Sequence, residues 1–341
     1  MKQALNLPKK IYFKTGSAPV ALRELSDIYH CNRALLITDP KLYLAGVAAP
    51  VVDQLRHQGI RVAEYFTIGE TVSYEDLRGA LPKLNEFQPD VILGVGGENA
   101  LSAAKALLAL YVDSELDLTA AADDSHLIPA CDKAKLVLIA ADCTSGAQTS
   151  PFAVLKDDEG EIRVLKSIYL LPELSITDAD FTQWLTAEGI KNGALKVLSF
   201  AVRTYLDPNC TEFTNGLLVD AISLLLKDTK AAMHGNPAAR EHLHNAAALV
   251  GAACGSVLDT VTTDLPNFPT NEERPTGDND IRCANLAEQL ASMIAALFWP
   301  TVTLWLCCDC QEKSSFYSQQ DAGCRNAAAG VPKSIERRLS R

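Results

Sequence analysis

The first 180 residues of this chain alternate short aliphatic runs with stretches of helical periodicity. The aliphatic runs lie at 33–39 (RALLITD), 60–66 (IRVAEYF), 91–97 (VILGVGG) and 135–142 (KLVLIAAD). Between them, 74–87 and 98–111 carry apolar residues three and four positions apart, which predicts helices packed against a sheet. Strands that alternate with helices are typical of a parallel sheet, so we predict an α/β domain of the nucleotide-binding type.

Beyond about residue 181 the pattern becomes helical. Apolar-periodic stretches run over 193–206, 213–233 and 240–261, and a proline-rich polar loop is expected at 266–280. At 341 residues the chain also exceeds the roughly 250 to 300 residues that one hydrophobic core usually supports. We therefore predict two domains, an α/β domain at 1–180 and a helical domain at 181–341.

The acidic balance of the chain limits its partners. A net charge of -11 without a basic stripe argues against nucleic acid and against a membrane surface. The longest apolar run, 293–308, is shorter than the roughly 20 residues of a membrane span, and Pro300 interrupts it. Residues 1–14 lack the apolar core and the cleavage site of a signal peptide. We therefore expect a cytoplasmic protein.

The ten cysteines fit a reducing compartment, because most of them lie in apolar runs, as Cys254 does. Cys307, Cys308 and Cys310 form a dense cluster. Zinc sites usually combine two spaced pairs, and neither a second pair nor a nearby histidine accompanies this cluster. Packed or incidental thiols are therefore favoured over a metal site, and the role of the cluster stays open.

A glycine turn joins the third aliphatic run to the helix that follows it. In VILGVGGENALS, Gly96 and Gly97 stand where a parallel strand would turn into a helix. Backbone N–H groups and the helix dipole at such a turn can hold a pyrophosphate. A tight strand-to-helix turn also needs glycine for steric reasons alone, and the spacing is not GxGxxG. The residues by themselves leave both interpretations open.

Several segments spread along the chain resemble one family. These landmarks are PKKIYFKTGSAPVALREL at 8–25, ITDPKLYLAG at 37–46, QPDVILGVGG at 88–97, PFAV at 151–154, TEFTNGLLVDAI at 211–222 and GVPKSI at 330–335. They are similar to the iron-dependent alcohol dehydrogenases, above all to the alcohol-dehydrogenase half of bifunctional aldehyde-alcohol dehydrogenases. The resemblance implies a Rossmann-like dinucleotide-binding domain followed by a helical, metal-binding domain, which is the dehydroquinate synthase-like fold.

The resemblance implies a cofactor site that is only partly retained. Asp39 matches the family's ribose-binding acid, and Gly96 and Gly97 match the first glycines of its phosphate loop. The predicted cofactor-binding residues are Asp39, Gly96, Gly97, Asn99, Ser102, Thr144 and Ser145, of which Asn99 and Ser102 replace the family's serine and aspartate.

Two acidic residues stand on the phosphate side of this implied site. Glu98 replaces the third glycine of the loop, and Asp142 belongs to the second phosphate-side segment. Each adds a negative charge beside the place of a pyrophosphate, although Glu98 could also simply stabilise the N-terminus of its own helix. NAD(H) binding is therefore expected to be weakened.

The positions that the resemblance assigns to metal ligands carry other residues. The aspartate position and the histidine position four residues later fall on Lys196 and Phe200, and the third ligand position falls on or beside Thr263. The fourth ligand position has no clear counterpart in this sequence. Ferrous iron and zinc need anionic oxygen or neutral imidazole nitrogen, so we expect neither metal.

Other residues offer little to rebuild the metal site. His242 and His244 are two apart, so on a helix they would point in different directions. Asp259 and Asp264 flank the Thr263 position and would hold a hard cation only weakly.

Three functions follow from this pattern. The first is a protein that has lost metal-dependent catalysis and forms a homo-oligomer, or a hetero-oligomer in which it acts as a binding or scaffold partner of an active paralogue. The alternative is an NAD(H)-dependent oxidoreductase that interconverts a small aldehyde and alcohol, either with a rebuilt metal site or without metal. In the metal-free case Lys196 would supply the fixed positive charge beside the substrate oxygen. The third is a protein that senses NAD(H) without reacting.

Overall fold

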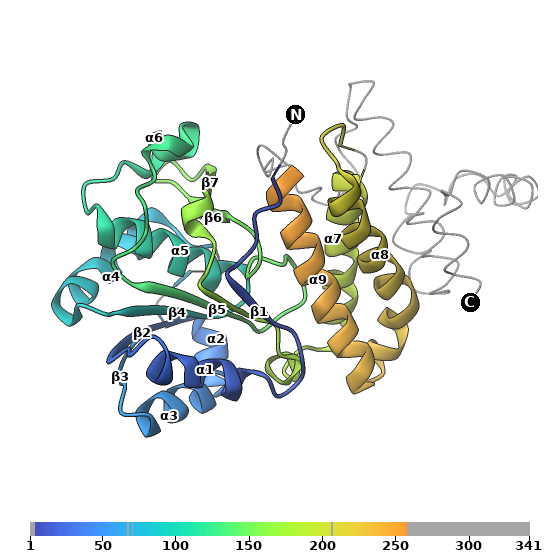
Figure 1. The fold of residues 1–341 in the computed structure, drawn as a ribbon, viewed down its shortest axis with the longest axis horizontal. Coiled ribbons are helices and arrows are strands. Elements are labelled where there is room, and N and C mark those ends of the chain that lie inside the picture. The colour runs from blue at the N-terminus through green and yellow to red at the C-terminus, as the bar shows by residue number, and fades with distance from the viewer. Residues whose placement is uncertain (1–3, 67, 70, 206, 258–341) are drawn as a thin grey trace, which may run out of the picture. The chain divides into compact units, whose positions relative to one another are not determined.

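The central element of the fold is a six-stranded parallel sheet (Figure 1). The computed structural model describes residues 4–257 except 67, 70 and 206, all within one compact unit. The strand order is β1-β8-β5-β4-β2-β3, with β1 Lys10–Tyr12, β2 Arg33–Thr38, β3 Arg61–Tyr65, β4 Val91–Gly96, β5 Lys135–Ala140 and β8 Leu174–Ile176. The parallel sheet and the four strands expected from the aliphatic runs are confirmed.

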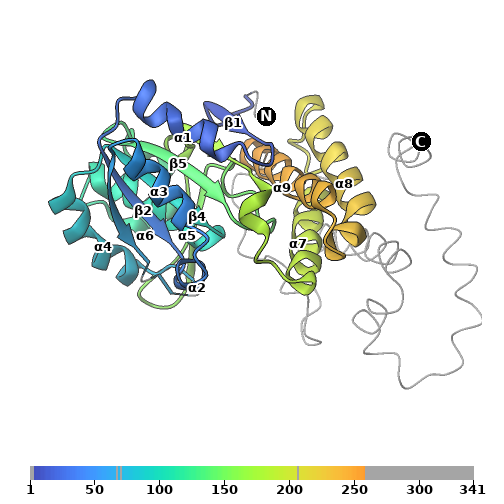
Figure 2. The ribbon, with the colours of Figure 1, turned by 90° about the horizontal axis from the view of Figure 1, so that it is seen from below.

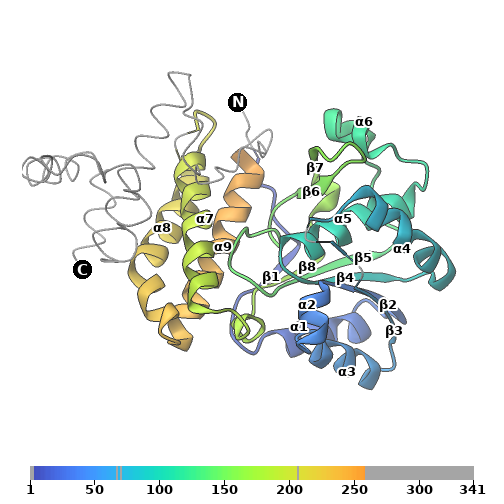
Figure 3. The ribbon, with the colours of Figure 1, turned by 180° about the vertical axis from the view of Figure 1, so that it is seen from behind.

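Helices cover both faces of this sheet (Figures 1 and 3). Helices α1 (Ala18–Asp27) and α3 (Ala49–His57) pack on one face, and α4 (Tyr74–Phe87) and α5 (Glu98–Val112) pack on the other. Successive strand residues divide between the two cores, because side chains alternate across a strand. Leu35 and Ile37 join α4 and α5, whereas Leu36 joins α1 and α3. Burial on both faces explains why these strands are almost continuously apolar.

Shorter elements complete the α/β part. The short helices are α2 Pro40–Leu44 and α6 Leu118–Asp123, with single 3₁₀ turns η1 Ser125–Leu127, η2 Ile168–Leu170 and η3 Ala179–Thr182. Strands β6 (Phe152–Lys156) and β7 (Ile162–Lys166) form a separate antiparallel hairpin.

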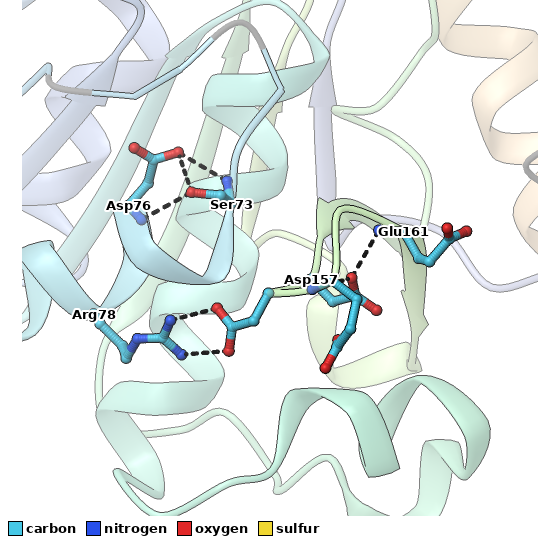
Figure 4. Close-up of polar contacts among 7 residues, drawn as sticks. Ser73, Asp76, Arg78, Asp157 and Glu161 are labelled. Atoms are coloured by element: carbon cyan, nitrogen blue, oxygen red, sulfur yellow. Dashed lines mark hydrogen bonds and ion pairs between the residues drawn. The ribbon is translucent and has the colours of Figure 1, made fainter.

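The hairpin is tied to α4. Arg78 of α4 forms an ion pair with Asp158 in the turn between β6 and β7, which links the helix to the hairpin (Figure 4). At the start of the same helix, Ser73 and Asp76 form a capping box. Capping satisfies backbone N–H groups that the first helical turn leaves unpaired.

Three long helices follow the α/β part and pack against one another (Figure 2). They are α7 Ala187–Tyr205, α8 Glu212–Met233 and α9 Pro237–Val257, which confirms the helices expected there. Among the described residues, no helix is long and apolar enough to cross a membrane. The predicted polar loop, Thr263 and the cysteine cluster at 307–310 lie outside the described residues, and the domain boundary at 180 stays a prediction.

Loop 142–151 connects the sheet to these helices through contacts that only glycine permits. Gly146 has a φ of +66°, and a Cβ built on it would lie 2.0 Å from the Ala247 carbonyl oxygen of α9. A Cβ on Gly251 would lie 2.0 Å from the Gly146 carbonyl oxygen. The Thr149 hydroxyl also donates to the Ala248 carbonyl oxygen over 2.7 Å. The loop and α9 are therefore in backbone contact.

The buried histidine of α9 should make the protein less stable in acid. His244 is 0% exposed, and neither ring nitrogen has a hydrogen-bond partner among the described residues. Burial lowers the pKa of His244 to about 4, against the smaller opposing effect of Asp178. The unfolded chain takes up this proton near pH 6.5, so this stability is lost as pH falls from about 6.5 to 4.

We expect this group to remove about 3 kcal/mol of unfolding free energy over that range. Urea unfolding of the wild-type chain and of His244→Leu at pH 7 and pH 4.5 measures the effect. The variant should lose clearly less stability on acidification than the wild type. His57→Leu, on the exposed surface of α3, is the matched control. Equal losses in wild type and His244→Leu would contradict the expectation.

Candidate functional site

The glycine turn lies at the edge of the sheet where β2, β4 and β5 end. The register pairs Thr38 with Val95 and Gly96 with Ala140, so the residues after these strands come together. Asp39 Oδ2 lies 2.6 Å from the place of a Cβ on Gly96, and Asp142 Oδ2 lies 2.5 Å from the place of a Cβ on Gly97. Any side chain at either glycine would therefore collide with a carboxylate.

Asp39 holds this turn by a direct bond. Its Oδ2 accepts a hydrogen bond from the Gly97 N–H over 3.3 Å, and burial raises the pKa of Asp39 while this bond opposes the rise. The structure thus brings together Asp39, Gly96 and Gly97, and their role in cofactor binding stays a prediction. Asn99 is half-buried in the first turn of α5.

Ser102 faces away from the turn. Its side chain is 1% exposed, and its hydroxyl accepts a hydrogen bond from the Val154 N–H over 3.0 Å. The hydroxyl is therefore occupied inside the protein, next to the β6–β7 hairpin. The cofactor-binding role of Ser102 stays a prediction.

The second phosphate-side segment places Asp142 and Thr144 beside the turn. The Thr144 hydroxyl donates to Asp142 Oδ2 over 2.9 Å. Burial raises the pKa of Asp142 to about 6; the bonds from Thr144 and the charge of Lys196 oppose this rise, and the charge of Glu98 adds to it. The Ser145 hydroxyl accepts from the Ala147 N–H over 3.2 Å, so it stabilises the loop itself.

Lys196 reaches from α7 to the start of α5. Its Nζ lies 2.8 Å from Glu98 Oε2, and the two side chains are 28% and 23% exposed. Phe200 follows one turn later on α7 and is half-buried. Sequence reasoning identified both positions of the pair but not their contact, because 98 residues separate them.

The residues at this position do not fit iron or zinc. An ammonium group repels a cation, a phenyl ring offers no lone pair, and the nearest carboxylate of α5 is already paired with Lys196. In the described part of the chain, no group of three or more His, Cys, Asp or Glu side chains could hold a metal ion.

A pocket opens beside the ion pair. It has a volume of about 440 Å³, and its lining comprises Asp142, Thr144, Trp184, Leu185, Thr186, Gly189, Asn192, Gly193 and Lys196. The Trp184 indole N–H donates to the Ala141 carbonyl oxygen over 2.7 Å, which fixes the ring. Sequence reasoning missed Trp184, because a single tryptophan before a helix carries no signal of its contacts.

The Glu98–Lys196 pair should show measurable coupling. A double-mutant cycle with Glu98→Gln and Lys196→Met is expected to give a coupling free energy of about 1 kcal/mol, because both side chains are partly shielded from water. The Arg78–Asp158 pair, whose side chains are 57% and 55% exposed, is the control and should couple less strongly. The measurement is urea unfolding at low salt. A coupling free energy no larger than that of the control pair would contradict the expectation that partial shielding strengthens the interaction of Glu98 with Lys196.

Comparison with known proteins agrees with this architecture. Residues 8–179 match the family model described as iron-containing alcohol dehydrogenase. The bifunctional aldehyde-alcohol dehydrogenase AdhE of Escherichia coli (strain K12) is 30% identical over 259 residues, which cover 72% of this chain and 29% of AdhE. The chain therefore belongs to the iron-containing alcohol dehydrogenase family. It spans less than a third of the length of AdhE.

Solved structures show the same fold. The iron-containing alcohol dehydrogenase of Thermococcus thioreducens superposes with a TM-score of 0.68 at 23% identity, covering 74% of this chain and 66% of that one. The sulfoacetaldehyde reductase of Bifidobacterium kashiwanohense, in complex with NAD+, gives a TM-score of 0.68 at 16% identity, covering 74% and 67%. A Rossmann-like domain followed by helices is thus the fold of this chain.

Proposed function

We propose that this member of the family has lost metal-dependent alcohol dehydrogenation. The observation that carries the proposal is the ion pair between Lys196 and Glu98, at 2.8 Å, where the family resemblance implies a metal ligand. A metal ion at this position would have to displace the Lys196 ammonium group, which is already paired with Glu98. Without a metal, the reaction lacks the Lewis acid that polarises the substrate oxygen, which contributes several kcal/mol.

We also propose that the chain binds NAD(H) only weakly. The Gly97 N–H, which could face a phosphate, already donates to Asp39. Glu98 and Asp142 place two carboxylates at the N-terminus of α5, where a pyrophosphate would otherwise meet the positive end of the helix dipole. The role that remains is binding, either as a homo-oligomer or as the partner of an active paralogue. Sedimentation of the purified chain, alone and mixed with such a paralogue, tests this role.

The decisive activity experiment follows NADH oxidation with short-chain aldehydes, with iron, zinc or a chelator present. We expect no turnover above the protein-free rate in any of the three conditions. Metal-dependent turnover would contradict the proposal directly.

Metal-free turnover would support the alternative, in which the Lys196 ammonium stabilises the developing alkoxide. This alternative hypothesis requires the activity to disappear in Lys196→Ala and to persist in Lys191→Ala. Lys191 lies on the same helix but does not line the pocket.

A further inference from the structure

Two cysteines lie at the same end of the helical bundle. Cys210 belongs to the turn between α7 and α8, just before α8 begins, and Cys254 lies in the last turn of α9. Helices α8 and α9 are joined by the short turn 234–236 and pack along one another, so they run antiparallel (Figures 1 and 3). They have 22 and 21 residues, so the start of α8 and the end of α9 lie at the same level.

The Cys210 thiol lies against the first turn of α8. Its Sγ is 3.4 Å from Thr214 Oγ1 and 3.1 Å from Asn215 Oδ1. Thr214 is buried, so the thiol is next to the face of α8 that packs inside the bundle. Cys210 itself is only half-buried, so a small reagent can reach it.

The Cys254 thiol lies inside the bundle at the same level. It is buried, and its Sγ is 3.0 Å from the hydroxyl of Thr204, which is also buried, near the end of α7. Burial raises the pKa of Cys254 to about 11; Thr204 and the charge of Arg203 oppose this rise, and Cys210 adds to it. Groups influence each other's pKa in this way when they are close in space. The contacts and the helix geometry therefore make the two thiols neighbours.

We propose that Cys210 and Cys254 form a redox-sensitive pair, which becomes a disulfide when it meets a small disulfide such as oxidised glutathione. The Cys210 thiolate attacks one sulfur of the reagent, which gives a mixed disulfide and releases one glutathione. The Cys254 thiolate then attacks the Cys210 sulfur and releases the second glutathione. Two protein thiols are thus oxidised and one glutathione disulfide is reduced, while the protons of the two cysteines pass to the released thiolates. The bridge ties the α7–α8 turn to α9.

The reaction should be slow at neutral pH and faster in mild alkali. Burial raises the pKa of Cys210; the bond to Thr214 opposes this rise, and the charge of Asp207 adds to it. Little thiolate is therefore present at pH 7 in either cysteine. We expect the bridge to form about tenfold faster at pH 8 than at pH 7, because the thiolate fraction grows tenfold per pH unit below the pKa.

The test is peptide mapping by mass spectrometry. The full chain is incubated with oxidised glutathione at pH 8, its remaining thiols are alkylated, and it is digested without reduction. We expect a peptide pair linked through Cys210 and Cys254. The linked pair should be absent from Cys210→Ser and from Cys254→Ser, and it should persist in Cys131→Ser, because Cys131 is also half-buried but lies outside the bundle.

Hydrogen exchange measures what the bridge does. Residues 207–215 should exchange more slowly in the oxidised wild type than in the reduced one, because the turn is then held to α9. The link is detected in the wild-type chain, so the test does not depend on how well the serine variants fold. A lasting glutathione adduct on Cys210, a link from Cys210 to another cysteine, or two unmodified thiols would each overturn the proposal. None of these outcomes affects the proposed loss of metal catalysis.

Discussion

Replacing Gly251 by alanine is expected to destabilise the protein by about 3 to 5 kcal/mol, because the new methyl group has no space and its neighbours are backbone atoms. A Cβ at this position would stand 2.0 Å from the Gly146 carbonyl oxygen and 2.7 Å from the Thr149 hydroxyl. Neither group can move away without a loss of free energy. The Thr149 hydroxyl is hydrogen-bonded to the Ala248 carbonyl oxygen, and Gly146 lies in the loop that contacts the backbone of α9. The free energy of unfolding in urea measures the loss.

Gly216→Ala is the matched control. Gly216 also lies inside a long helix, α8, but a Cβ on it would meet nothing within 4 Å. Alanine is the better helix former, so this substitution should stabilise the protein by about 0.5 to 1 kcal/mol. A lower free energy of unfolding in Gly251→Ala and a higher one in Gly216→Ala would support the backbone contact between loop 142–151 and α9. A neutral Gly251→Ala would contradict it.

The second large effect is expected at Lys105 of α5. Its side chain is 0% exposed, and its Nζ donates to the carbonyl oxygens of Ala147, Ser150 and Phe152, each over 2.7 Å. Lys105→Met keeps much of the volume but leaves three buried carbonyl groups without this donor. We expect a loss of about 3 to 5 kcal/mol, because unsatisfied buried polar groups are costly.

A substitution of a surface lysine is the control that distinguishes the loss of the Lys105 hydrogen bonds from the loss of a positive charge. Lys227→Met, at an exposed position of α8, should change the free energy of unfolding by less than about 0.5 kcal/mol. Hydrogen exchange should also show faster exchange of loop 142–151 in Lys105→Met, because Lys105 anchors this loop to α5. Unchanged exchange together with unchanged stability would show that the three bonds do not hold the loop.

The sequence predicted the central strands well, because burial on both faces makes a strand such as β4 almost continuously apolar. It missed β1 and β8, which have three residues each and therefore no readable period. The predicted helix at 74–87 coincides with α4, although Pro82 lies inside it. Local periodicity thus accounts for the longer elements that are buried in the two cores of the sheet.

The candidate site was only partly predictable. Asp39, Gly96 and Gly97 were predicted as one site through the family resemblance, and the structure places them at the ends of the adjacent strands β2 and β4. The pairing of Glu98 with Lys196 and the bond from Trp184 to Ala141 depend on how α7 and the segment before it dock on the sheet. Such docking is set by tertiary packing, and no local pattern of residue types encodes it.

The central claim, that metal-dependent catalysis is lost, is tested most directly by the metal content of the purified protein. The chain and an intact iron-containing alcohol dehydrogenase would be expressed with iron and zinc supplied, purified in parallel without chelators, and measured by mass spectrometry of the elements. We expect well below one iron or zinc ion per chain here and close to one in the intact enzyme, because Lys196 and Phe200 cannot ligate a metal. Stoichiometric iron or zinc in this protein would contradict the claim.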